Sequence, residues 1–150
     1  MSGITFTHVN IIAKDWRALS HFYQVVFGCV PVPPERRLSG AWLEAATGVR
    51  DAALEGEHVR LPGHGDRGPT LEIFSYKNNL DRPPPAANRL GIGHIAFEVD
   101  SVSPVLDTVL AHGGGALGQI RVAEVPGRGK LTFVYAADPE GNIIELQAWG

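Results

Sequence analysis

The chain has 150 residues, of which 44% are hydrophobic and 19% charged, with a net charge of −3. This is the balance of an ordinary globular protein, large enough to bury a core and without the basic footprint of nucleic-acid binding. Its apolar stretches are too broken to span a membrane, and MSGITFTHVN lacks the basic and apolar regions of a signal peptide. The only cysteine, Cys29, cannot form an internal disulfide, so we expect a cytoplasmic protein with a buried core thiol.

The first predicted elements are a strand that begins at His8 and a helix that follows it. Asp15 is a good helix N-cap, and the apolar residues after it fall on one helical face. An insertion with a short helix is expected between Glu35 and Asp51, and TLEIFSY (Thr70–Tyr76) is expected to be the last strand of this half. Residues 77–89 are rich in Pro and Asn without periodicity, which predicts a linker.

The same order of elements recurs when His94 is placed over His8. A strand is followed by a helix, with Ser103 as the expected cap and Pro104 in the first turn. DPEGN (138–142) predicts a hairpin turn before the last strand, in which Glu145 takes the place of Glu72. We therefore predict an α+β fold. It would be a single domain of residues 1–150 with two tandem β-α-β-β-β modules, about 4–76 and 90–149, in a curved, barrel-like sheet.

Strand alternation assigns side chains to the two faces of this sheet. On the first strand of each module, a histidine lies opposite a purely apolar row. His8 shares its face with Asn10, and His94 shares its face with Glu98. The last strands place further residues on the same faces: Glu72, Phe74, Tyr76, Glu145, Gln147 and Trp149. We expect a cleft in which the two histidines and two glutamates meet, whereas the other four histidines, His58 among them, have no repeat partner and are expected to be structural.

Two imidazoles and two carboxylates are a suitable ligand set for a divalent transition metal. Four protein ligands on an octahedral ion leave two positions for water or for two substrate oxygens. A carbonyl polarised in this way makes the adjacent C–H acidic, and a nearby carboxylate can accept its proton. The residues expected to contact the substrate are Asn10, Phe74, Tyr76, Glu98, Gln147 and Trp149.

Four motifs in this order carry a resemblance to a known family: FTHVNI…HFYQVVFG, TLEIFSY, GIGHIAFEVD and DPEGNIIEL. They resemble the vicinal oxygen chelate superfamily, over almost the whole chain outside the insertion and the linker. That superfamily includes glyoxalase I, methylmalonyl-CoA epimerase, extradiol dioxygenases and metal-free drug-binding proteins of the bleomycin-resistance type. The resemblance implies metal ligands at His8, Glu72, His94 and Glu145, a set similar to that of bacterial glyoxalase I, which favours nickel or cobalt.

The chain also departs from individual members of the family. Glyoxalase I has an arginine at the position of Ile12 and an asparagine at the position of Tyr76, and these losses argue against glutathione as a substrate. Epimerases usually carry glutamine at the position of Glu72. Aromatic residues on the predicted ligand face, such as Phe74, favour an apolar or aromatic substrate.

The leading expectation is a metal-dependent lyase or isomerase with Ni, Co, Zn or Mn, in which Glu145 or Glu72 moves the proton. One alternative is an Fe(II) extradiol dioxygenase that uses His8, His94 and Glu145. The other is a metal-free protein that binds small molecules. The resemblance also implies a homodimer, and the expected partner is a small-molecule substrate, with neither nucleic acid nor a membrane.

Overall fold

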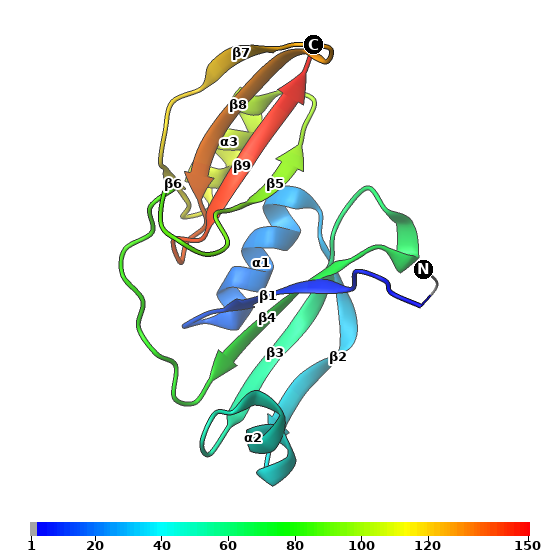
Figure 1. The fold of residues 1–150 in the computed structure, drawn as a ribbon, viewed down its shortest axis with the longest axis vertical. Coiled ribbons are helices and arrows are strands. Elements are labelled where there is room, and N and C mark those ends of the chain that lie inside the picture. Colours follow the sequence, from blue (N-terminus) through cyan, green and yellow to red (C-terminus); the bar gives the residue numbers. More distant parts are fainter. Residues whose placement is uncertain (1–2) are drawn as a thin grey trace. The chain divides into compact units, whose positions relative to one another are not determined.

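The computed structural model describes residues 3–150, which form two compact units that divide between Asp81 and Arg82. Each unit has a mixed β-sheet with one longer helix (Figure 1). This confirms the predicted α+β class. Residues 77–89, the predicted linker, contain no helix or strand. Within the described residues, no helix is long and apolar enough to cross a membrane.

The first unit follows the predicted β-α-β-β-β order, with one added helix. Its strands are β1 (His8–Ile12), β2 (Val30–Ser39), β3 (Ala53–Arg60) and β4 (Thr70–Tyr76). Its helices are α1 (Trp16–Phe27), α2 (Ala41–Thr47) and a short 3-10 turn, η1 (Gly65–Arg67). The sheet order is β1-β4-β3-β2; β1 runs parallel to β4, and the other pairs are antiparallel. Helix α2 lies within the predicted insertion.

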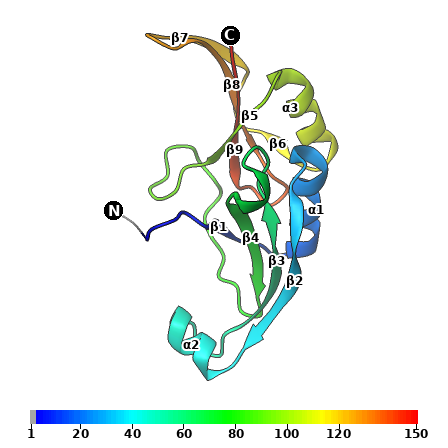
Figure 2. The ribbon, with the colours of Figure 1, turned by 90° about the vertical axis from the view of Figure 1, so that its right-hand side faces the viewer.

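Helix α1 packs on one face of this sheet, against β3 and β4 (Figure 2). It begins where expected, because the Asp15 side chain accepts a hydrogen bond from the backbone N–H of Ala18 at 3.0 Å. It ends at Gly28, whose φ of 67° is left-handed. Apolar residues of α1 and of the sheet fill the core beneath it, including Leu19, Phe22, Tyr23, Val59, Leu71 and Ile73.

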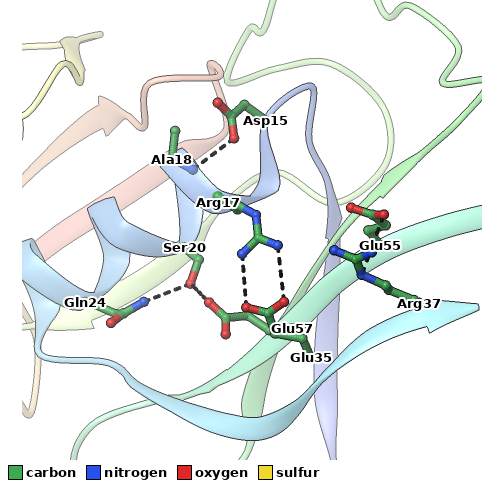
Figure 3. A network of polar contacts seen from close by, with 9 residues as sticks. All are labelled: Asp15, Arg17, Ala18, Ser20, Gln24, Glu35, Arg37, Glu55 and Glu57. Atoms are coloured by element: carbon green, nitrogen blue, oxygen red, sulfur yellow. Dashed lines mark hydrogen bonds and ion pairs between the residues drawn. The ribbon is translucent and has the colours of Figure 1, made fainter.

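Polar contacts also tie α1 to the sheet (Figure 3). Arg17 donates to both carboxylate oxygens of Glu35 on β2, at 3.0 and 3.2 Å. Ser20 donates to Glu57 on β3 and accepts from Gln24. The Arg17 hydrogen bond lowers the pKa of the Glu35 carboxyl below its usual value.

The opposite face of the first sheet is partly covered by α2. Leu43 of this helix packs with Ala52, Leu54 and Phe74 in an apolar cluster that Tyr76 also joins. The ring of Phe74 lies over its β3 partner, Gly56. A Cβ atom at Gly56 would lie 2.0 Å from the carbonyl oxygen of Ile73 and 2.5 Å from that ring, so only glycine fits there. The α2 cluster therefore closes one end of this face and leaves the end near His8 uncovered by α2.

The second unit repeats the arrangement with one interrupted strand. Its elements are β5 (Ile95–Glu98), α3 (Val102–Ala111), β6 (Gly115–Ala116), β7 (Arg121–Val125), β8 (Gly129–Ala137) and β9 (Ile143–Trp149). Strand β5 runs parallel to β9, as β1 does to β4. Both β6 and β7 pair with β8 in antiparallel fashion, so together they take the place of β2. Strand β2 has a register break of its own between Val32 and Arg36.

Two local predictions in the second unit have different outcomes. The predicted cap of α3, Ser103, is wrong. The N-cap is Ser101, in an extended conformation, and the helix begins at Val102, which is buried. The DPEGN turn is confirmed. The buried Asp138 side chain accepts from the backbone N–H groups of Glu140 and Asn142, each at 2.9 Å, and this fixes the hairpin between β8 and β9.

Candidate metal centre

Three strands of the first unit bring His8, His58 and Glu72 together. The β3–β4 register places His58 directly opposite Glu72, and β1 supplies His8 from the other side of β4. The His58 Nε2 atom lies 2.8 Å from Glu72 Oε2, and the His8 Nε2 atom lies 3.6 Å from Glu72 Oε1. One ligand atom from each residue lies within 4.8 Å of the other two. We call these three residues the first-unit triad.

Each imidazole of the triad is held at its other nitrogen by a threonine. His8 Nδ1 lies 3.1 Å from Thr7 Oγ1, and His58 Nδ1 lies 2.8 Å from Thr70 Oγ1. This leaves Nε2 of both rings facing the Glu72 carboxylate. Metal-binding histidines are typically oriented in this way, through a hydrogen bond at the nitrogen that does not bind the ion.

The triad differs in exposure from one residue to the next. The side chains of His58 and Glu72 are 15% and 16% exposed, whereas that of His8 is 39% exposed. Burial lowers the pKa of His58 below its ordinary value, and the opposing attraction of Glu72 does not outweigh it. His58 is therefore neutral at neutral pH, which is the protonation state that binds metals.

Asn10 contacts the same carboxylate, as its place on the predicted ligand face implied. Its side-chain amide donates to Glu72 Oε1 and to the Glu72 backbone carbonyl, each at 3.1 Å. Both carboxylate oxygens of Glu72 therefore have a polar partner, Asn10 on one and His58 on the other. Glu72 is held in a fixed orientation.

The second unit brings together the other predicted pair. His94 precedes β5, and its Nε2 atom lies 2.8 Å from Glu145 Oε2 on β9. The β8–β9 register places Tyr135 opposite Glu145, and its ring centroid is 4.7 Å from that of His94. Each unit thus joins a histidine at its first strand to a glutamate on its last strand. That all four residues bind one ion stays a prediction.

The sequence alone predicted a structural role for His58, because the repeat was matched through the first and last strands and gave this residue no partner. The register supplies the partner: His58 lies opposite Glu72, and Tyr135 lies opposite Glu145. The separations differ, 72 − 58 = 14 residues against 145 − 135 = 10, because the β3–β4 connection is longer than the β8–β9 turn. Counting along each hairpin from its turn would have found the pair.

The residues predicted to bind substrate have varied surroundings. Phe74 is 8% exposed in the α2 cluster, and Tyr76 packs against the same cluster. Glu98 is exposed and lies beside Gln147 in the β5–β9 register. The guanidinium group of Arg128 lies over the ring of Trp149, 4.2 Å from the ring centroid. Substrate contact remains a prediction for all six residues.

A cavity of about 480 Å³ lies at the α2 end of the first sheet. Its lining includes Trp16, Leu54, Ser75 and Tyr76, but no triad residue. Cys29 is 3% exposed, and burial raises its thiol pKa to about 11. It is a core thiol, as predicted, and not a nucleophile at neutral pH.

Comparisons with known proteins agree with this fold. A family model described as the Glyoxalase/Bleomycin resistance protein/Dioxygenase superfamily matches residues 5–146. The chain therefore belongs to this superfamily. A search of curated proteins finds no match.

Among solved structures, the chain is similar to a glyoxalase family protein from Bacillus cereus, with a TM-score of 0.81 and 18% identity over 99% of this chain and 98% of that one. It is also similar to a glyoxalase family protein from Enterococcus faecalis, with a TM-score of 0.56 and 22% identity over 97% of both chains. A third is the fosfomycin resistance protein FosX from Listeria monocytogenes, complexed with Mn(II) and sulfate. It has a TM-score of 0.55 and 16% identity over 100% of this chain and 94% of that one. With sequence identities of 16–22%, these similarities show the fold alone.

Proposed function

We propose that this protein is a metal-dependent lyase or isomerase that moves a proton next to a carbonyl group of a small substrate. The observation that carries the proposal is the His–Glu pair in each unit, with an imidazole Nε2 atom 3.6 or 2.8 Å from a carboxylate oxygen. The proposed ligands are His8, Glu72, His94 and Glu145. The Mn(II) in the FosX structure supports a metal in this fold.

The donor set fits a divalent ion such as Ni, Co, Zn or Mn, since it combines imidazole and carboxylate. Such an ion, when bound, would polarise two neighbouring oxygens of the substrate. Manganese, like the other ions, takes both nitrogen and oxygen donors, so the residues do not select one metal.

Glu145 is the better candidate for proton transfer. Both oxygens of Glu72 have a polar partner, Asn10 at Oε1 and His58 at Oε2, whereas His94 contacts Glu145 at Oε2. The Oε1 atom of Glu145 is therefore the proposed proton acceptor. In the proposed step, Glu145 takes the proton from the hydroxyl-bearing carbon next to the carbonyl. It returns that proton to the former carbonyl carbon, while the hydroxyl proton passes to the former carbonyl oxygen. The carbonyl and hydroxyl groups have then exchanged places, so the product is an isomer formed without an oxidant.

The proposed substrate is small, has two neighbouring oxygen atoms and carries an apolar or aromatic group. Phe74, Tyr76 and Trp149 support the apolar part, since they lie on the same strand faces as the glutamates. Ile12, exposed at the position of the glutathione-binding arginine of glyoxalase I, argues against a glutathione adduct.

The experiment is exchange of the substrate C–H with solvent deuterium, followed by proton NMR. Small α-hydroxy ketones with apolar or aromatic groups are incubated with the protein in D2O, with and without added Ni or Co. We expect metal-dependent exchange next to the carbonyl, lost in Glu145→Gln while the fold, measured by circular dichroism, is kept. Equal exchange by Glu145→Gln and the unaltered protein would reject the role of Glu145. No exchange with any metal or substrate of this class would reject the proposal.

A second candidate is an Fe(II) dioxygenase that cleaves aromatic rings, with His8, His94 and Glu145 as ligands. This candidate needs only three ligands, so Glu72 would not bind the ion. The contacts of Glu72 with Asn10 and His58 favour it, because they give this carboxylate partners other than a metal. Oxygen uptake with catechols in the presence of Fe(II) distinguishes the two candidates. The homodimer and the cytoplasmic location remain predictions.

A further inference from the structure

We propose that the first unit binds a divalent transition-metal ion on its own, with His58 as a third ligand beside His8 and Glu72. This rests on the proposed function only in sharing His8 and Glu72. It goes further in assigning a ligand that has no equivalent in the second unit. It also implies that the ion is held chiefly by the first unit.

The spacing of the three donor atoms suits one ion. Ligands about 2.1 Å from a tetrahedral ion lie about 3.4 Å from one another. The two histidine-to-carboxylate separations, 2.8 Å from His58 to Oε2 and 3.6 Å from His8 to Oε1, lie on either side of that value. With one donor atom taken from each residue, all three atoms lie within 4.8 Å of one another, so side-chain rotations would be needed to bring them onto one ion.

The threonines at the far nitrogens supply an independent argument. In the metal-free arrangement, His58 donates from Nε2 to Glu72, so its Nδ1 accepts from the Thr70 hydroxyl. An ion at Nε2 requires the other tautomer, in which Nδ1 carries the proton. A hydroxyl can both donate and accept, so Thr70 can hold either tautomer without moving. Thr7 offers the same to His8.

The second unit lacks the third donor. Tyr135 occupies the position of His58 and offers a phenol hydroxyl in place of the imidazole nitrogen that suits these ions. The second unit therefore presents two donors, His94 and Glu145, where the first presents three. A three-donor site in one unit retains an ion that a two-donor site alone would lose.

The test is metal titration of full-length variants, with Zn(II) or Co(II) and a competing chromophoric chelator. In His94→Ala/Glu145→Gln, we expect one equivalent still bound, more weakly than in the unaltered protein. Adding His58→Phe should abolish this binding. In the otherwise unaltered protein, His58→Phe should weaken binding by more than about tenfold, at or beyond the effect of losing a supporting residue. The matched control, Tyr135→Phe, should leave the affinity unchanged.

The titrations separate the inference from the four-ligand proposal. If His94→Ala/Glu145→Gln binds no ion while the unaltered protein does, the inference is overturned, and the four-ligand proposal survives alone. If instead the double variant binds as tightly as the unaltered protein, the inference holds and the four-ligand proposal fails. His58→Gln keeps a polar contact with Glu72 but has no imidazole. If His58→Gln binds the ion as tightly as the unaltered protein, His58 is a positioning residue and its role as a ligand is rejected. Melting curves in EDTA show whether each variant is folded, and if His58→Phe is not folded, the affinity of His58→Gln decides the test.

Discussion

The two units share one plan and differ at the strand next to the last. In both, a histidine at the first strand meets a glutamate on the last strand. Opposite that glutamate, the first unit has His58 and the second has Tyr135. The comparison shows that both units keep the same histidine–glutamate pair. The residue at one register position, opposite the glutamate, decides whether a unit has two or three potential metal donors.

The same pair of strands differs again two residues away. In the first unit, Gly56 lies opposite Phe74, whereas in the second Phe133 lies opposite Gln147. The phenylalanine of this pair is therefore on the last strand in the first unit and on the strand before it in the second. In the first, it joins the cluster under α2, and glycine is required beneath it. The two units therefore carry different side chains at this register position, although their backbones follow the same plan.

The largest effect expected from this comparison is that of Gly56→Ala. Its Cβ would overlap a backbone carbonyl oxygen at 2.0 Å, which cannot move without disturbing β4. We expect a loss of about 3 kcal/mol in the free energy of unfolding, at the upper end of overpacking effects, measured by urea denaturation. The matched control is Gly115→Ala on β6, where a Cβ would meet nothing within 4 Å. Equal stability of the two variants would show that the Phe74–Gly56 contact is not specific.

Metal-linked stability is expected to differ between the two glutamates. An ion present at 100 times its dissociation constant stabilises a protein by about 2.7 kcal/mol. Glu72→Gln removes a donor from the triad, so it should lose most of this gain, and Glu145→Gln should lose less. The measurement is the shift in melting temperature on adding Zn(II), with EDTA as the reference for each variant. A larger loss in Glu145→Gln would place the stronger ligand set in the second unit.

The next effect concerns Cys29, which in the repeat alignment lies over Gly115. Burial raises the pKa of Cys29 from its ordinary value of 9.0 to about 11. The folded state therefore keeps the proton that the unfolded chain loses, so stability falls as pH rises from about 9 towards 11 and is unaffected below. The loss is on the order of 1–3 kcal/mol, at about 1.4 kcal/mol per pKa unit. Urea unfolding between pH 8 and 10.5 should show a shallower slope for Cys29→Ala; an unchanged slope would contradict this.

The smallest effect is expected at the exposed Arg17–Glu35 pair, which ties α1 to β2. Since Arg17 lowers the pKa of Glu35, the pair stabilises the fold above the usual carboxyl pKa and loses this contribution as pH falls through the lowered value. Glu35→Gln should slightly reduce the melting temperature at low salt, and added salt should remove the difference. A salt-independent loss would point to packing instead of charge.

Much of this architecture could be predicted from the sequence because the repeat supplies two independent copies of each signal. Alternation predicted that His8 and His94 would each share a face with a glutamate of the last strand, and each does meet that glutamate in its unit. Asp15 marked the start of α1. The interruption between β6 and β7 and the partner of Glu72 could not be placed in this way. Both depend on pairing along a hairpin, and the long connection between β3 and β4 hides that register from a comparison by separation alone. The place of α2 over Phe74 depends on tertiary packing.

The most direct measurement of the central claim is the metal content of the purified protein by elemental mass spectrometry, beside His8→Ala and His21→Ala. His8 belongs to every ligand set considered, whereas His21 is an exposed residue of α1. We predict about one equivalent of Ni, Co, Zn or Mn in the unaltered protein and in His21→Ala, and its loss in His8→Ala. An absence of metal even after reconstitution, or full retention in His8→Ala, would contradict the account.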